Sequence, residues 1–153
     1  MVKLEFSNTT KKYQVNEKKL RALVDRIAAL AGVKKGTLSL SFVGEKKIRE
    51  VNKKFRNINR STNVISFPFM EYAGKEFILG DIIICPLVAE KQAAKEDNDF
   101  RQYVAFLIIH GFLHLLGFDH IKEEDRIIME RKEEEIFKKI DDFDFIREVD
   151  VYK

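Results

Sequence analysis

Residues 104–120 read VAFLIIHGFLHLLGFDH, and this stretch predicts both the centre of the fold and its candidate site. The six residues from Val104 to Ile109 are apolar on every side of a helix, which is typical of a helix buried inside a domain. We expect this helix over residues 100–116, because Gly117 permits the left-handed conformation that commonly ends a helix. A central buried helix is therefore expected to lead directly into the candidate site.

All three histidines of the chain lie at the end of that helix. His110 and His114 are four residues apart, about 40° around a helix and about 6 Å along it, so their imidazoles face the same point. His120 follows the glycine, where a reversed chain can return toward the first two. A single histidine on a buried helix is more often a hydrogen-bonded core residue, but chance rarely places three at ligand spacing. Three neutral imidazoles leave one tetrahedral position of zinc open, as in catalytic sites, so one Zn²⁺ per chain is expected.

The spacing H-x3-H-x2-G-x2-H is also that of the metzincin peptidases. In those enzymes a glutamate follows the first histidine and acts as the general base. Gly111 stands at that position here and cannot accept a proton. A zinc peptidase therefore stays open as a second hypothesis, behind a metal-dependent hydrolase that acts on another substrate.

The composition fits one domain over residues 1–153. Hydrophobic residues make up 45% of the chain and charged residues 35%, which indicates a globular protein with a core. The sequence has no run of about 18 apolar residues, so no membrane association is expected. Cys85 is the only cysteine, which excludes an intrachain disulfide; together with an N-terminus unlike a signal peptide, this favours a cytoplasmic protein. The net charge of +3 is a weak indication of a polyanionic partner.

Apolar periodicity predicts the other elements and an α+β fold. Strands are expected at residues 2–6, 37–43, 63–67 and 81–85, and helices at residues 17–31, 45–55, 86–96 and 123–139. Because strands and helices show no clean βαβ alternation, we expect a small mixed sheet, four-stranded or similar, packed with helices. In the last helix the inward positions are expected to be Ile127, Ile128 and Ile136, and the solvated face to include Glu133, Glu134 and Glu135.

Residues 110–120 resemble the signature HGxLHLxGxDH of the YbeY family of bacterial rRNA maturation factors, which are regarded as single-strand-specific endoribonucleases. Two further blocks are similar in order and spacing: Phe55-Arg56 followed by residues 61–68 (STNVISFP), and residues 79–82 (LGDI). The likeness covers about residues 50–136. One departure is Phe106, where many members carry a further histidine, but a three-histidine site does not need it.

The resemblance implies cleavage of single-stranded RNA during maturation of small-subunit ribosomal RNA, with the small ribosomal subunit as a partner. It implies that Arg56 and the metal ligand His114 are catalytic residues. Chemistry agrees for Arg56, since a guanidinium can bind two phosphate oxygens with parallel donors. Without the resemblance, Arg56 would be interpreted as a surface residue. Asp81 and Asp119 could each orient a ligand imidazole, or could simply begin a strand and form a turn.

Basic and aromatic residues are interleaved over residues 46–60. Such a surface can follow an RNA backbone while Phe55 stacks on a base, but the same pattern also fits a solvated helix face. Ser66 is a candidate substrate-binding residue, although Ser66 and Asn63 could simply end a strand. No general base is identified by the sequence. A third hypothesis is a non-catalytic RNA-binding assembly factor in which the metal is structural.

Overall fold

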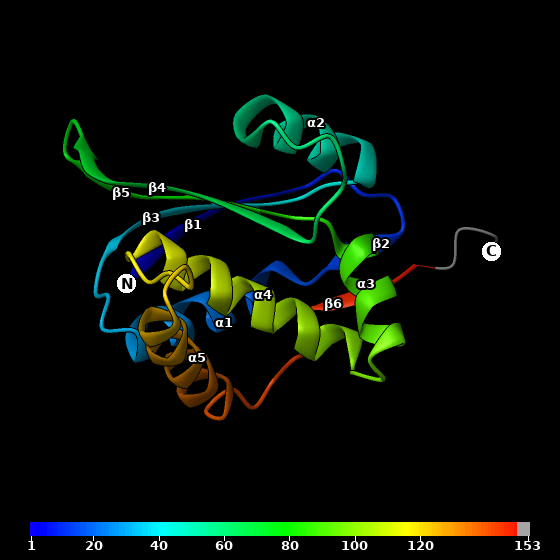
Figure 1. Cartoon of the computed structure of the whole chain (residues 1–153). Helices are drawn as coiled ribbons and strands as arrows, with labels where there is room; N and C mark the ends of the chain where they lie inside the picture. The colour runs from blue at the N-terminus through cyan, green and yellow to red at the C-terminus, as the bar shows by residue number, and fades with distance from the viewer. Residues whose placement is uncertain (150–153) are drawn as a thin grey trace.

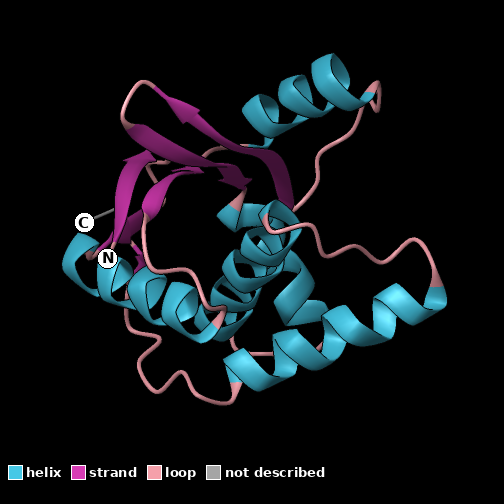
Figure 2. Cartoon of the chain, turned by 90° about the vertical axis from the view of Figure 1, so that its left-hand side faces the viewer, coloured by secondary structure: helices cyan, strands magenta, loops and turns pink. Residues whose placement is uncertain are grey.

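A four-stranded mixed sheet separates the helices into two layers (Figures 1 and 2). The structure is a computed structural model, and it describes residues 1–149. The strands lie in the order β1 (Val2–Asn8), β3 (Gly36–Phe42), β5 (Glu76–Ile84) and β4 (Val64–Ala73). The first three are parallel and β4 runs antiparallel to β5, so the expected mixed sheet is confirmed. Strand β4 is at one edge of the sheet.

Helices lie on both sides of the sheet (Figure 1). Below the sheet in that view are α1 (Glu17–Leu30), α4 (Phe100–Leu115) and α5 (Glu123–Phe137), and above it is α2 (Glu45–Arg56). Helix α3 (Pro86–Lys95) packs against α4, and the short strands β2 (Tyr13–Val15) and β6 (Ile146–Glu148) pair with each other. The α+β fold is thus confirmed. Within residues 1–149, none of the helices has the length and apolarity needed to cross a membrane.

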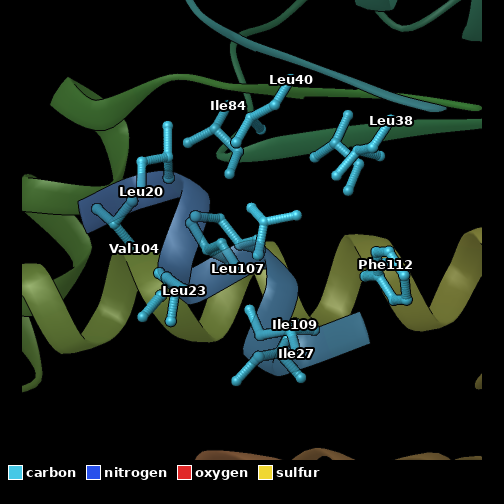
Figure 3. Close-up of a cluster of buried hydrophobic side chains, with 14 of the residues drawn as sticks. Leu20, Leu23, Ile27, Leu38, Leu40, Ile84, Val104, Leu107, Ile109 and Phe112 are labelled. Carbon is cyan, nitrogen blue, oxygen red and sulfur yellow. The ribbon is translucent and has the colours of Figure 1, made fainter. Parts of the chain in front are cut away.

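Helix α4 is the central helix, as its sequence predicts. Asp99 caps its first turn by accepting a hydrogen bond from the backbone amide of Gln102 at 3.0 Å. Apolar side chains then cover the helix on all sides, and most of them are buried. Figure 3 shows side chains of α4 packed together with those of α1 and those of the sheet. The labelled members of this core are Val104, Leu107, Ile109, Phe112, Leu20, Leu23, Ile27, Leu38, Leu40 and Ile84.

Gly111 allows α4 to lie close to the sheet. A Cβ atom at this position would lie 3.0 Å from Cγ2 of Ile82 and 3.2 Å from Oγ of Ser66. A side chain at position 111 would therefore point into the tight contact between helix and sheet, and Ile82 and Ser66 would have to shift to make room for it. This close packing is a physical reason for glycine at the position where a metzincin peptidase has its glutamate.

Several expectations about individual elements were wrong. Ile127 and Ile128 are exposed, with 39% and 56% of their surface accessible, because α5 turns a different stripe toward α4. Strands β4 and β5 extend beyond residues 63–67 and 81–85 into one long hairpin. Strands β2 and β6 were not predicted, since three-residue strands show no clear periodicity. Residues 150–153 of the expected domain lie outside the described residues.

Candidate metal centre

The three histidines converge at the C-terminal end of α4. His110 and His114 lie in the last two turns of the helix, which ends at Leu115. Gly117 then adopts φ of 99°, in the left-handed region, and its amide donates to the carbonyl of His114 at 3.1 Å. The chain reverses there, as predicted, and returns His120 to the other two. One nitrogen from each ring lies within 4.8 Å of the others.

The spacing of these nitrogens fits a single metal ion. The Nε2 atoms of His110 and His114 are 3.2 Å apart. Nitrogens bound to one tetrahedral zinc ion, at about 2.0–2.1 Å from the metal, lie about 3.3 Å from each other. His110 and His114 are half-buried and His120 is exposed, so the group is closed on the helix side and open to solvent on the other. Such a site has room for a further ligand.

His114 favours the neutral form that binds metal ions. Burial lowers the pKa of His114 below its ordinary value of 6.5, and the neighbouring His110 and His120 lower it further. A neutral imidazole offers a lone pair to a metal ion, whereas an imidazolium does not. Protons therefore compete little with a metal ion for His114 at neutral pH.

Glu133 contacts this site, so the prediction that it lies on a solvated helix face was wrong. Its side chain is 6% exposed, and its Oε2 lies 3.0 Å from Nδ1 of His110. Glu134 and Glu135 are exposed, as expected. The signal for Glu133 was present in its position, since it lies four residues after Met129 and three before Ile136, both buried. These three residues form one stripe of the helix, and a carboxylate on an otherwise apolar stripe indicates a buried partner.

The histidines line a cleft of about 600 Å³ that also involves β4. The cleft wall opposite the histidines consists of residues 62–68, which lead into and form the first half of β4. Arg56, the last residue of α2, reaches the cleft from the helix layer on the other side of the sheet. Within residues 1–149, Arg56 makes no ion pair, so its guanidinium is available to a ligand.

A basic surface continues from Arg56 along α2. Residues 45–60 carry seven basic and two acidic side chains, a net charge of +5, whereas the whole chain carries +3. The part of the chain that the structure describes contains no ion pair to any of these seven basic residues. They are Lys46, Lys47, Arg49, Lys53, Lys54, Arg56 and Arg60. Unpaired positive charge on one surface is a feature of proteins that bind polyanions.

The two aspartates expected near the histidines occupy different places. Asp119 lines the cleft, and its Oδ1 accepts a hydrogen bond from the amide of Ile121 at 3.3 Å, so it forms a turn. Asp81 follows Gly80 in β5 and lies on the opposite face of the strand from Ile82, which faces α4. Burial raises the pKa of Asp81, and the Glu5 carboxylate adds to this rise. Among residues 1–149, no hydrogen bond links either aspartate to a histidine. Asp81 cannot orient an imidazole as expected, because it lies on the face of the sheet away from the histidines.

The three remaining candidates lie on or beside the cleft. Ser66 lines it, with Oγ near Gly111 of α4. Phe55 is 60% exposed, and its ring packs edge-to-face on Phe67 of the cleft wall, with ring centroids 5.2 Å apart. Asn63 donates from its side-chain amide to Oε1 of Gln92 at 2.9 Å, so it anchors the start of β4 to α3.

The fold and the histidine group define an α+β protein with a candidate mononuclear metal site beside a cleft. The chain belongs to the Endoribonuclease YbeY family, whose sequence profile matches residues 5–141, and the resemblance inferred from the sequence is confirmed. A relative from Finegoldia magna named Endoribonuclease YbeY is 43% identical over 104 residues, covering 67% of this chain and 68% of that protein. One of the same name from Bacillus mycoides is 39% identical over 129 residues, covering 78% and 83%. The solution structure of TM1509 from Thermotoga maritima superimposes with a TM-score of 0.59 at 28% identity, over 90% of both chains.

Proposed function

We propose that this protein is a metal-dependent, single-strand-specific endoribonuclease that acts in the maturation of small-subunit ribosomal RNA. One observation carries the proposal: three convergent histidines share a cleft with an arginine that has no ion-pair partner within residues 1–149. Cleavage of a phosphodiester requires neutralisation of charge on its non-bridging oxygens, which a metal ion and a guanidinium can provide together. The relatives from Finegoldia magna and Bacillus mycoides carry the name of an endoribonuclease, which supports the RNA-cleaving part of the proposal.

In this proposal, His110, His114 and His120 hold one zinc ion, which would supply Lewis acidity toward a phosphoryl oxygen when bound. Arg56 binds the non-bridging oxygens of the same phosphate through two parallel N–H donors and holds it beside the histidines. Ser66 donates its hydroxyl to a phosphate or sugar oxygen from the cleft wall. The chain's own residues thus bind and orient the phosphate that is to be cleaved.

The surroundings of the cleft favour an unpaired strand. The basic surface of residues 45–60 offers a path for an RNA backbone, and the exposed ring of Phe55 offers a stacking partner for a base. Bases inside a duplex are already stacked and cannot use such a ring. The same proposal includes a polyanionic substrate such as ribosomal RNA, the small ribosomal subunit as a partner, and a cytoplasmic location.

The test is cleavage of a labelled single-stranded RNA oligonucleotide and of the matching duplex. We expect the zinc-loaded protein to cut the single strand, the chelator-treated protein to be inactive, and added zinc to restore cleavage. His114→Ala should abolish cleavage without unfolding the protein, as judged by circular dichroism. Cleavage at the wild-type rate by a folded, metal-free His114→Ala protein would refute the proposal.

The basic surface also suits an RNA-binding assembly factor with a structural metal, which is the second candidate function. That function predicts tight binding of single-stranded RNA but no cleavage by fully metal-loaded protein, and unfolding of His114→Ala. A peptidase is disfavoured, because Gly111 supplies no base and a side chain at this position would crowd Ile82 and Ser66.

A further inference from the structure

Glu133 is the only buried charged side chain among residues 1–149. Transferring an ionised carboxylate out of water is costly unless a partner compensates for it. In the part of the chain that the structure describes, no lysine or arginine contacts this carboxylate, and its partner is Nδ1 of His110. A buried carboxylate that contacts a half-buried imidazole stabilises the fold poorly by itself, which indicates a role at the neighbouring site.

The ring of His110 is held from two directions. Oε2 of Glu133 lies 3.0 Å from Nδ1, and the ring of Phe106 stacks on the imidazole with a centroid distance of 6.2 Å and an interplanar angle of 30°. Phe106 in turn packs against Phe137 of α5, with centroids 6.4 Å apart. The other ring nitrogen, Nε2, faces Nε2 of His114 at 3.2 Å. These contacts fix the orientation of the imidazole.

We propose that Glu133 is a positioning residue for the metal centre, which fixes the His110 tautomer and links metal binding to the docking of α5 on α4. The inference rests on the proposed three-histidine metal site. A carboxylate that accepts a hydrogen bond from Nδ1–H leaves the lone pair on Nε2, the nitrogen that faces the other ligands. Its negative charge also offsets part of the positive charge of a divalent cation, which three neutral imidazoles do not offset.

The link to α5 follows from the position of Glu133 in the helix. Met129, Glu133 and Ile136 form the buried stripe of α5, so the carboxylate lies in the middle of the surface that contacts α4. When a cation pulls electron density from His110, the Nδ1–H···Oε2 hydrogen bond strengthens. Metal binding should then tighten the contact between the two helices and protect the backbone amides of α5.

The experiment compares zinc affinity in Glu133→Gln with that in Glu134→Gln, a matched control one residue along on the exposed face. Affinity is measured by competition with a chromophoric chelator, in the absence of RNA. We expect the affinity of Glu133→Gln to fall by about 10- to 100-fold and that of Glu134→Gln to stay within about twofold of wild type. Glu133→Asp, which keeps the charge, should recover part of the loss. Equal affinities in the two glutamine variants would overturn the inference.

Two measurements on the wild-type protein keep the inference testable even if Glu133→Gln does not fold. Nitrogen-15 NMR of the metal-free protein should show His110 protonated at Nδ1 and not at Nε2; the opposite tautomer would overturn the inference. Hydrogen exchange of the α5 amides should slow when zinc is added, and an unchanged rate would overturn the link to α5. A wild-type protein that binds no zinc would instead refute the metal site of the proposed function.

Discussion

Replacing Arg56 by alanine is expected to lower kcat/KM for single-stranded RNA by about 30- to 150-fold. Arg56 lines the same cleft as the three histidines, and no acidic side chain within residues 1–149 pairs with it. A hydrogen bond to a charged group contributes about 1.5–3 kcal/mol, with the low end suited to an exposed side chain such as this one. Two such bonds to one phosphate, reduced for solvent exposure, give about 2–3 kcal/mol, and each 1.4 kcal/mol is a factor of about ten.

Two further variants separate charge from geometry. Arg56→Lys keeps the positive charge but loses the paired donors, so we expect a smaller loss, about tenfold. Arg26→Ala removes an exposed arginine of α1, away from the cleft, and should stay within about twofold of wild type. The assay is single-turnover cleavage of a labelled oligonucleotide, with equal bound zinc in each variant.

The dependence of RNA affinity on salt gives an independent check of the same contact. Loss of one phosphate contact should reduce the slope of log affinity against log salt by about 0.7 for a single strand. Equal cleavage rates for Arg56→Ala and Arg26→Ala would refute the assignment of Arg56 to the phosphate. A slope unchanged from wild type would refute a direct contact.

Three further predictions concern stability. Gly111→Ala should lower the free energy of unfolding by about 1 kcal/mol in urea titrations, because overpacking against Ile82 outweighs the gain in helix propensity; a more stable variant would contradict the close packing of α4. Gly80→Ala should cost about 3 kcal/mol or more, since φ is 147° and a Cβ would collide with the carbonyl oxygen of Phe67; an unchanged melting temperature would contradict this. The metal-free protein should lose stability as pH falls below 6.5, because the pKa of His114 is lowered in the fold and the unfolded chain takes up the proton first. Thermal melts at neutral and mildly acidic pH check this, and His114→Gln should flatten the dependence.

The sequence predicts α4 and the histidine group well, because both depend on residues close together in the chain. The all-round apolar surface from Val104 to Ile109 indicates burial without any knowledge of its neighbours. The return of His120 depends only on the helix end and on the left-handed conformation of Gly117. Local patterns of this kind predict a site that is built from one helix and the turn that follows it.

Contacts between distant segments were predicted less well. The hydrogen bond between Glu133 and His110 requires α5 to dock on α4, and a run of three glutamates suggests solvent exposure unless the stripe through Met129 is followed. Asp81 was a candidate for orienting an imidazole, but strand alternation puts it on the face of the sheet away from the histidines. Arg56 comes from the opposite helix layer, so only the family resemblance pointed to it.

The long β4–β5 hairpin was underestimated for a different reason. Residues 69–74 of the hairpin are all exposed, so they lack the alternation of apolar and polar residues that indicates a half-buried strand. The register also shifts between Pro68 and Glu71, which interrupts any alternation at that point. Pairing with β5 holds these residues in a strand that their own sequence pattern does not predict.

A zinc titration of the metal-free protein, with bound zinc and RNA cleavage measured on the same samples, decides whether the three histidines hold a catalytic metal ion. We expect cleavage of the single-stranded oligonucleotide to be absent without zinc, to rise in proportion to occupancy and to level off at one ion per chain. In His114→Ala, neither tight binding nor cleavage should appear. Cleavage in the metal-free protein, or occupancy of one ion without any cleavage, would show that the metal is not catalytic.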